Sequence, residues 1–114
     1  MNKELKEIFG SGLTVSGITV PVAHLKYKGH EKTYVLWTVT GETPSLSADD
    51  EDIFSTVSVD VDVYSDANYT IIVKAIKKLM KQYSWIWTED SAEMFEDDTG
   101  LYHKTISFEK ERSL

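Results

Sequence analysis

Three consecutive acids precede a Thr-Gly pair and a histidine in the segment EDDTGLYH, residues 96–103. Carboxylates and imidazoles are the ligands and proton-transfer groups of many hydrolytic metal sites. A second pair of carboxylates, Asp60 and Asp62, is two residues apart in an alternating segment, so both would lie on one face of a strand. Together with Asp97 or His103 they could hold a hard divalent cation. A metal-dependent enzyme that uses Asp60, Asp62 and the 96–103 turn is therefore one hypothesis.

The spacing of these acids does not match a known metal or catalytic motif. A calcium loop of the EF-hand type needs acids at alternate positions, whereas residues 96–98 and 49–52 place their acids side by side. The sequence contains no HExxH pattern, no glycine-rich phosphate loop and no Gly-x-Ser-x-Gly elbow. It has no cysteine, which excludes thiolate chemistry and cysteine-ligated zinc. The simpler interpretation of residues 96–100 is an acidic β-turn that leads into a strand, with no catalytic residue, metal or cofactor.

Charge is segregated along the chain, whose formal net charge is −7. Residues 33–73 and 82–103 contain acids but neither lysine nor arginine. Such acidic surfaces repel phosphate backbones, which argues against tight nucleic-acid binding. The first residues lack the apolar core of a signal peptide, and no apolar run is long enough to cross a bilayer. We therefore expect a cytosolic protein, unless it leaves the cell inside a particle.

Hydrophobic periodicity predicts the strands that would position the acidic residues. In residues 56–65 four valines alternate with polar residues, which is the clearest strand pattern in the chain. Residues 22–27 and 33–39 also read as strands, and a turn at residues 28–30 would join them as a hairpin. Another strand is expected to begin at residues 85–87, and a last one to cover residues 101–108.

Other segments lack the alternating pattern of a strand and predict a loop and two helices. Residues 41–55 combine glycine, proline, serine and four successive acids, so we expect a long, mobile, acidic loop there. Residues 68–83 have an apolar stripe, which predicts an amphipathic helix. Its opposite side carries four lysines that we call the basic ridge: Lys74, Lys77, Lys78 and Lys81. A shorter helix is expected over residues 2–9.

These elements predict a single α+β domain over residues 1–114. Its mainly antiparallel sheet of about four strands would pack against one long helix, with a short N-terminal helix beside it. The tryptophans Trp37, Trp85 and Trp87 leave a further hypothesis open, a small cytosolic ligand-binding module with an apolar pocket near them.

Two blocks of the sequence resemble a known protein family. VDVYSDANYTIIVKAIKKLM (residues 61–80) and MFEDDTGLYHKTISFEKE (residues 94–111) are similar to the tail terminator, or tail completion, proteins of long non-contractile-tailed phages and prophages. In that family a valine-alternating strand, Tyr-Ser and a helix precede an acidic turn, Thr-Gly-Leu-Tyr-His-Lys and a strand. Small head–tail joining proteins of the same assembly pathway share this general layout.

The resemblance implies a structural virion protein that is not an enzyme. Such a protein forms a ring, a homohexamer, that caps the tail tube, ends its polymerisation and joins it to the head connector. The implied partners are further copies of itself, the tail tube protein and the head connector protein, with no membrane and with DNA only passing through the lumen. The implied location is the host cytoplasm before assembly and the virion tail afterwards.

A ring needs two unlike surfaces on each copy, and the segregated charges of this chain could supply them. The alternative to partner binding is that any one of these lysines simply lies on a solvent-exposed helix face. The candidate partner-binding residues are Lys74, Lys77, Lys78, Lys81, Asp49, Asp50, Glu51, Asp52, Glu96, Asp97 and Asp98.

Overall fold

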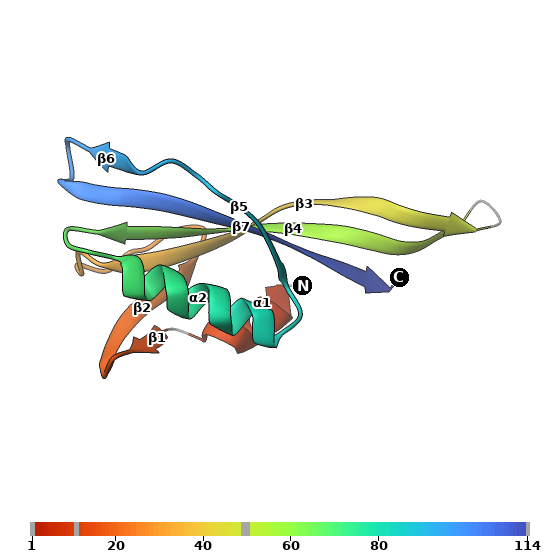
Figure 1. Ribbon diagram of the computed structural model, residues 1–114, viewed down its shortest axis with the longest axis horizontal. Helices are drawn as coiled ribbons and strands as arrows, with labels where there is room; N and C mark the ends of the chain where they lie inside the picture. The colour runs from red at the N-terminus through yellow and green to blue at the C-terminus, as the bar shows by residue number, and fades with distance from the viewer. Residues whose placement is uncertain (1, 11, 49–50, 114) are drawn as a thin grey trace.

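The computed structural model describes residues 2–10, 12–48 and 51–113, with the backbone alone at residues 2, 45–48 and 52 (Figure 1). The described residues form one mixed seven-stranded sheet and two helices. The strand order is β1-β2-β3-β4-β7-β5, and β6 also pairs with β7. The elements are α1 (Asn2–Phe9), β1 (Gly12–Val15), β2 (Ile18–His24), β3 (Tyr34–Ala48), β4 (Glu51–Ser65), α2 (Thr70–Gln82), β5 (Ile86–Asp90), β6 (Met94–Glu96) and β7 (Leu101–Ser113).

The predicted fold class is wrong. Instead of about four strands packed against one long helix, the described chain is mostly sheet, with seven strands and two short helices. One reason is the β1–β2 hairpin, which the hydrophobic periodicity did not predict. Its turn residues Ser16 and Gly17 have φ values of 50° and 80°, as a tight two-residue hairpin turn with positive φ requires.

The hairpin expected from residues 22–27 and 33–39 is also wrong. β2 pairs with β3 in parallel, with Val22 opposite Val35, and its other edge pairs antiparallel with β1. Parallel neighbours need a crossover connection, and residues 25–33 form it. Residues 28–30 therefore lie in a crossover and do not form a hairpin turn.

β3 and β4 form a long hairpin whose outer part projects beyond the body of the molecule (Figure 1). We call residues 41–48 and 51–55 the arm. The expectation of a loop over residues 41–55 is therefore wrong for the described residues, which are paired strand; their mobility stays a prediction. Asp49 and Asp50 lie outside the described residues. Pro44 is accommodated beside a register shift, where a strand tolerates proline.

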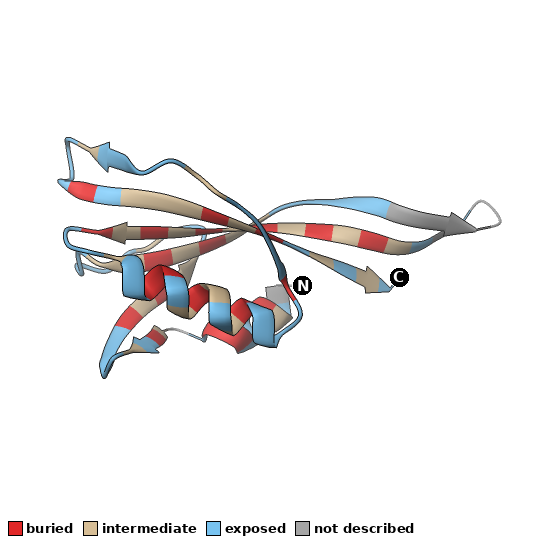
Figure 2. Ribbon diagram, in the orientation of Figure 1, coloured by how far each residue is buried: buried red, intermediate tan, exposed pale blue. Residues whose placement is uncertain are grey.

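The two helices cover one face of the sheet, and this face forms the core (Figures 1 and 2). The predicted inward face of β4 is confirmed, because its four valines are fully buried: Val57, Val59, Val61 and Val63. Each stabilises the fold by about 1.5–3 kcal/mol. The predicted stripe of α2 is largely confirmed, with Ile72, Val73, Ile76 and Met80 buried. At its start, the Oδ1 of Asn68 accepts a hydrogen bond of 2.9 Å from the N–H of Thr70.

Candidate partner-binding surfaces

The four lysines of α2 do not form a uniform basic ridge. Lys74, Lys78 and Lys81 are exposed, as expected, but Lys77 is partly buried. Its Nζ lies 3.0 Å from Oδ2 of Asp90 on β5 and 3.9 Å from the ring centroid of Trp87. Lys77 therefore connects α2 to the edge of the sheet, and its placement on a purely solvated helix face is wrong.

Asp90 is the centre of a small charged cluster. Besides Lys77, it accepts a hydrogen bond of 2.8 Å from Nε1 of Trp87 and lies 3.5 Å from Nζ of Lys104. Burial by itself would raise the pKa of Asp90, but the hydrogen bonds from Lys77 and Trp87 and the nearby positive charges outweigh it and lower the pKa. Asp90 was not a predicted site residue, because nothing in its local sequence distinguishes it from its neighbour Glu89.

A groove with a volume of about 490 Å³ lies between the second half of α2 and the start of β5. We call it the Trp87 groove. Its apolar side chains are unusually accessible, since Ile86 is 66% exposed and Trp87 is 53% exposed. The lining residues are Lys77, Lys81, Ser84, Trp85, Ile86, Trp87 and Phe108. The groove thus combines exposed apolar surface with two ammonium groups.

The three tryptophans do not share one pocket. Trp85 and Trp87 line the groove, but Trp37 is 1% exposed in the core. Its ring stacks on that of His24, with a centroid distance of 4.0 Å. The apolar pocket hypothesised near all three tryptophans is therefore not formed, and the groove beside two of them takes its place.

The candidate acidic residues lie at opposite ends of the molecule (Figure 1). Glu51 is exposed at the start of β4, near the tip of the arm, and Asp52 follows it in the same strand. At the other end, Glu96 closes β6, and Asp97 and Asp98 are exposed in the turn before β7. These acids therefore belong to two separate surfaces.

The residues of the hypothetical metal site lie on the face of the sheet that the helices leave open. Nε2 of His103 is 3.0 Å from Oδ1 of Asp62, and the hydroxyl of Thr105 donates to the same oxygen at 2.5 Å. Asp60 accepts a hydrogen bond of 2.7 Å from Oγ of Ser107. Among the described residues, no group of three or more His, Asp and Glu side chains is placed to hold a metal ion. Asp62 and His103 meet as hypothesised, while Asp97 lies in the exposed turn.

The same face carries a row of stacked rings. The centroid distances are 4.4 Å from Tyr27 to Tyr34, 4.8 Å from Tyr34 to Tyr64 and 4.1 Å from Tyr64 to His103. Burial, and then the charges of Asp62 and nearby groups, raise the pKa of Tyr64 to about 12. The row joins the crossover to β3, β4 and β7, and so fixes the end of the sheet that is remote from the arm.

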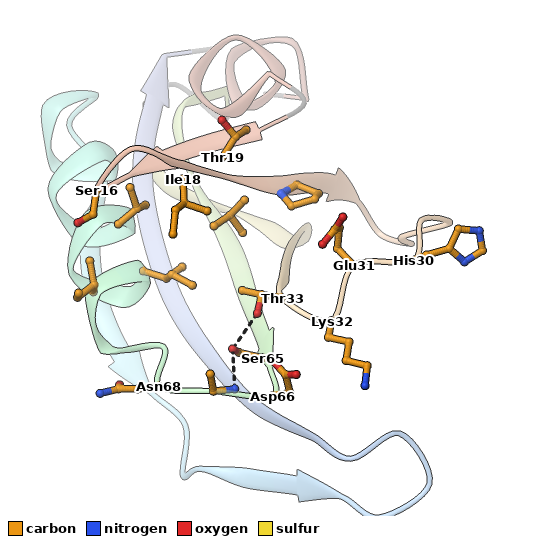
Figure 3. Close-up of a pocket in the computed structure, with 16 residues that line it drawn as sticks. Ser16, Ile18, Thr19, His30, Glu31, Lys32, Thr33, Ser65, Asp66 and Asn68 are labelled. Atoms are coloured by element: carbon orange, nitrogen blue, oxygen red, sulfur yellow. Dashed lines mark hydrogen bonds between the residues drawn. The ribbon is translucent and has the colours of Figure 1, made fainter.

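A second cavity, of about 530 Å³, lies between the β1–β2 hairpin, the crossover and the start of α2 (Figure 3). Its wall is held by a hydrogen bond of 3.0 Å between the hydroxyls of Thr33 and Ser65. Exposed Ile18 contributes apolar surface. The polar lining includes the acids Glu31 and Asp66 beside His30 and Lys32. Because both signs of charge are present, this cavity does not favour one class of partner.

Comparison with models of known protein families finds no match, and a search of curated proteins finds no significant relative. No helix in the described part of the chain is long and apolar enough to cross a membrane. A function for this chain is therefore inferred from the arrangement of these surfaces and from its sequence resemblance.

Proposed function

We propose that this protein is a structural component of the tail of a long-tailed phage or prophage. It acts as a tail terminator: a homohexameric ring caps the tail tube, ends its polymerisation and joins it to the head connector. The observation that carries the proposal is the projecting arm. It places paired strand outside the protein's own core, where it serves contacts with other molecules.

The charges of the described surfaces support a ring. A closed ring uses heterologous contacts, in which one patch meets a different patch on the next copy. An acidic arm and a helix face with three exposed lysines are two such patches on one small chain. An acidic lumen would also let DNA pass without binding.

One observation favours a second candidate, the metal-dependent enzyme. His103 and Asp62 are in contact, as a metal or proton-transfer site would need. Against this candidate, the carboxylates of Asp60 and Asp62 already accept hydrogen bonds from hydroxyl groups of β7. Calorimetric titration with Mg²⁺, Mn²⁺ or Ca²⁺ separates the two, since loose carboxylate pairs bind at about millimolar levels at best. Micromolar, stoichiometric binding that Asp60→Asn abolishes would favour the enzyme.

The direct test of the tail function is genetic. The gene is inactivated in the phage or prophage that carries it, and particles are viewed by electron microscopy with and without a plasmid copy. We expect overlong or headless tails without the protein and normal particles with the wild-type copy. A plasmid copy carrying Lys26→Gln, a substitution on the exposed crossover, is the matched control and should restore normal tails. Normal, infectious particles in the absence of the protein would contradict the proposal.

A further inference from the structure

We infer that neighbouring copies of this chain join by placing the arm of one copy in the Trp87 groove of the next. The acidic end of the arm then faces the lysines of α2. This inference rests on the proposed function for its biological setting and deepens it, because it names the two surfaces that close the ring.

The groove has the composition of a binding site for an acidic, partly apolar segment. Trp87 and Ile86 expose most of their apolar surface on β5, an edge strand that pairs with β7. Exposed tryptophan beside cations is typical of the residues that dominate interface energies. The charged lining residues in the described part of the chain are Lys77 and Lys81, with no acid among them.

The groove is also preorganised. Asp90 holds Lys77 in place over the ring of Trp87, so this wall loses little side-chain freedom when a partner binds. Lys81, at the rim, is exposed and makes no ion pair in the part of the chain that the structure describes. It is therefore available to a carboxylate from outside.

The arm has complementary chemistry. No lysine or arginine occurs in residues 33–73, and four acids stand together at residues 49–52. Ile53 lies two residues after Glu51 in β4 and is 37% exposed, which gives the arm an apolar contact next to its charges. Its strands hydrogen-bond to one another along their inner edges, so the arm enters the groove as a preformed hairpin.

The segment that binds in the Trp87 groove comes from a second copy, because the arm does not reach the groove of its own chain. The molecule is 52 Å long, and the arm points away from the body that carries α2 and the start of β5 (Figure 1). Each copy offers one arm and one groove, so contacts of this kind continue from copy to copy until a ring closes.

Site-specific photo-crosslinking tests the contact in the purified full-length chain at high concentration. A photoreactive amino acid replaces Ile53, and cross-linked peptides are identified by mass spectrometry. We expect cross-links between copies that map to residues 77–87. The matched control carries the same group in place of Asp97, at the opposite end of the molecule, and should give no cross-link to those residues. Absence of cross-links between copies from position 53, or their mapping to the cavity of Figure 3, would overturn the inference.

Charge reversal tests the pairing in a second way. One variant carries Lys78→Glu and Lys81→Glu in the groove region, and another carries Glu51→Lys and Asp52→Lys in the arm. We expect each to self-associate at least about tenfold more weakly in sedimentation experiments, and an equal mixture of both to recover association, because each reversed surface then meets its complement. Reversal of Lys26 and Lys28, which lie on the exposed crossover, should have no effect. A mixture no better than the separate variants would contradict the pairing.

These experiments separate the two proposals. Cross-links from the arm to the groove together with normal tails in the gene-inactivated phage would disprove the tail function and leave the contact between copies standing. Abnormal tails together with cross-links that avoid the groove would support the tail function and disprove the arm contact.

Discussion

Lys77 and Lys78 are adjacent on α2 but have different surroundings. Lys77 binds Asp90 and covers the ring of Trp87, whereas Lys78 is exposed. We predict that Lys77→Gln lowers the free energy of unfolding by about 1–2 kcal/mol, because a partly buried carboxylate loses its nearest cation. Lys78→Gln should change it by less than about 0.5 kcal/mol. Urea unfolding of both variants checks this, and equal stabilities would show that the Lys77–Asp90 contact contributes nothing.

Asp90 should give the protein a measurable acid sensitivity. Its pKa is lower in the folded protein than its ordinary value, so its ion pairs stabilise the fold above the unfolded pKa and are lost as the pH falls through the folded pKa. We predict that Asp90→Asn is less stable than the wild type at neutral pH and that the difference shrinks below about pH 4. Urea unfolding over a pH series measures it, with exposed Asp97→Asn as the control. A difference that persists unchanged into strong acid would contradict the assignment.

Some of these contacts follow from sequence and others do not. Asp62 and His103 were paired as candidates from residue chemistry, and they are indeed in contact. The contact of Lys77 with Asp90 joins two elements through the packing of α2 beside β5. Helical periodicity assigns a residue to a side of the helix, but it does not say where the boundary of the covered side falls.

At the scale of elements, local patterns identified the strongly periodic segments and misread those that depend on pairing. Residues 56–65 alternate so regularly that their buried face was predicted correctly. The arm contains Gly41, Pro44 and adjacent acids, all unfavourable in isolated strands. It is nevertheless strand because its two halves pair with each other, and the residue pattern of neither half alone reveals that pairing. Likewise, the turn at Ser16 and Gly17 gave β2 a different antiparallel partner from the one expected.

The arm should be separable from the body. Replacing residues 45–54 with Asn-Gly would close the hairpin between Pro44 and Ser55, which are already paired, with a favoured two-residue turn. Among the removed residues whose side chains the structure describes, Glu51 and Ile53 are exposed and Phe54 is half-buried, so we predict a loss of about 1–2 kcal/mol in stability. Self-association should be lost. Circular dichroism, urea unfolding and sedimentation velocity check both parts, and unfolding of the shortened chain would show that the arm belongs to the core.

At the scale of the whole molecule, the arm makes the chain larger than a compact protein of its length. The radius of gyration is 15.3 Å, whereas a compact domain of this length has about 13 Å. The described side chains of the arm are exposed at residues 41–44, Glu51 and Ile53, whereas Phe54 is half-buried and Ser55 is buried. The body of the molecule contains the core that stabilises the fold, and the arm is left free for contacts with other molecules.

If oppositely charged surfaces join the copies, self-association must depend on salt. We predict that raising the ionic strength from about 0.05 M to 0.5 M weakens association about tenfold or more, because screening acts on the exposed acids and lysines. Trp87→Ala should weaken it at both salt concentrations, since it removes apolar contact that salt does not screen. The control is Tyr102→Ala, an aromatic residue with 39% exposure on β7 outside the groove, which should leave association unchanged. Sedimentation velocity over a concentration series at each ionic strength gives the dissociation constants. If association is insensitive to salt but lost in Trp87→Ala, the groove is still a contact surface between copies. That result would contradict the inference that the acidic arm is its charged partner.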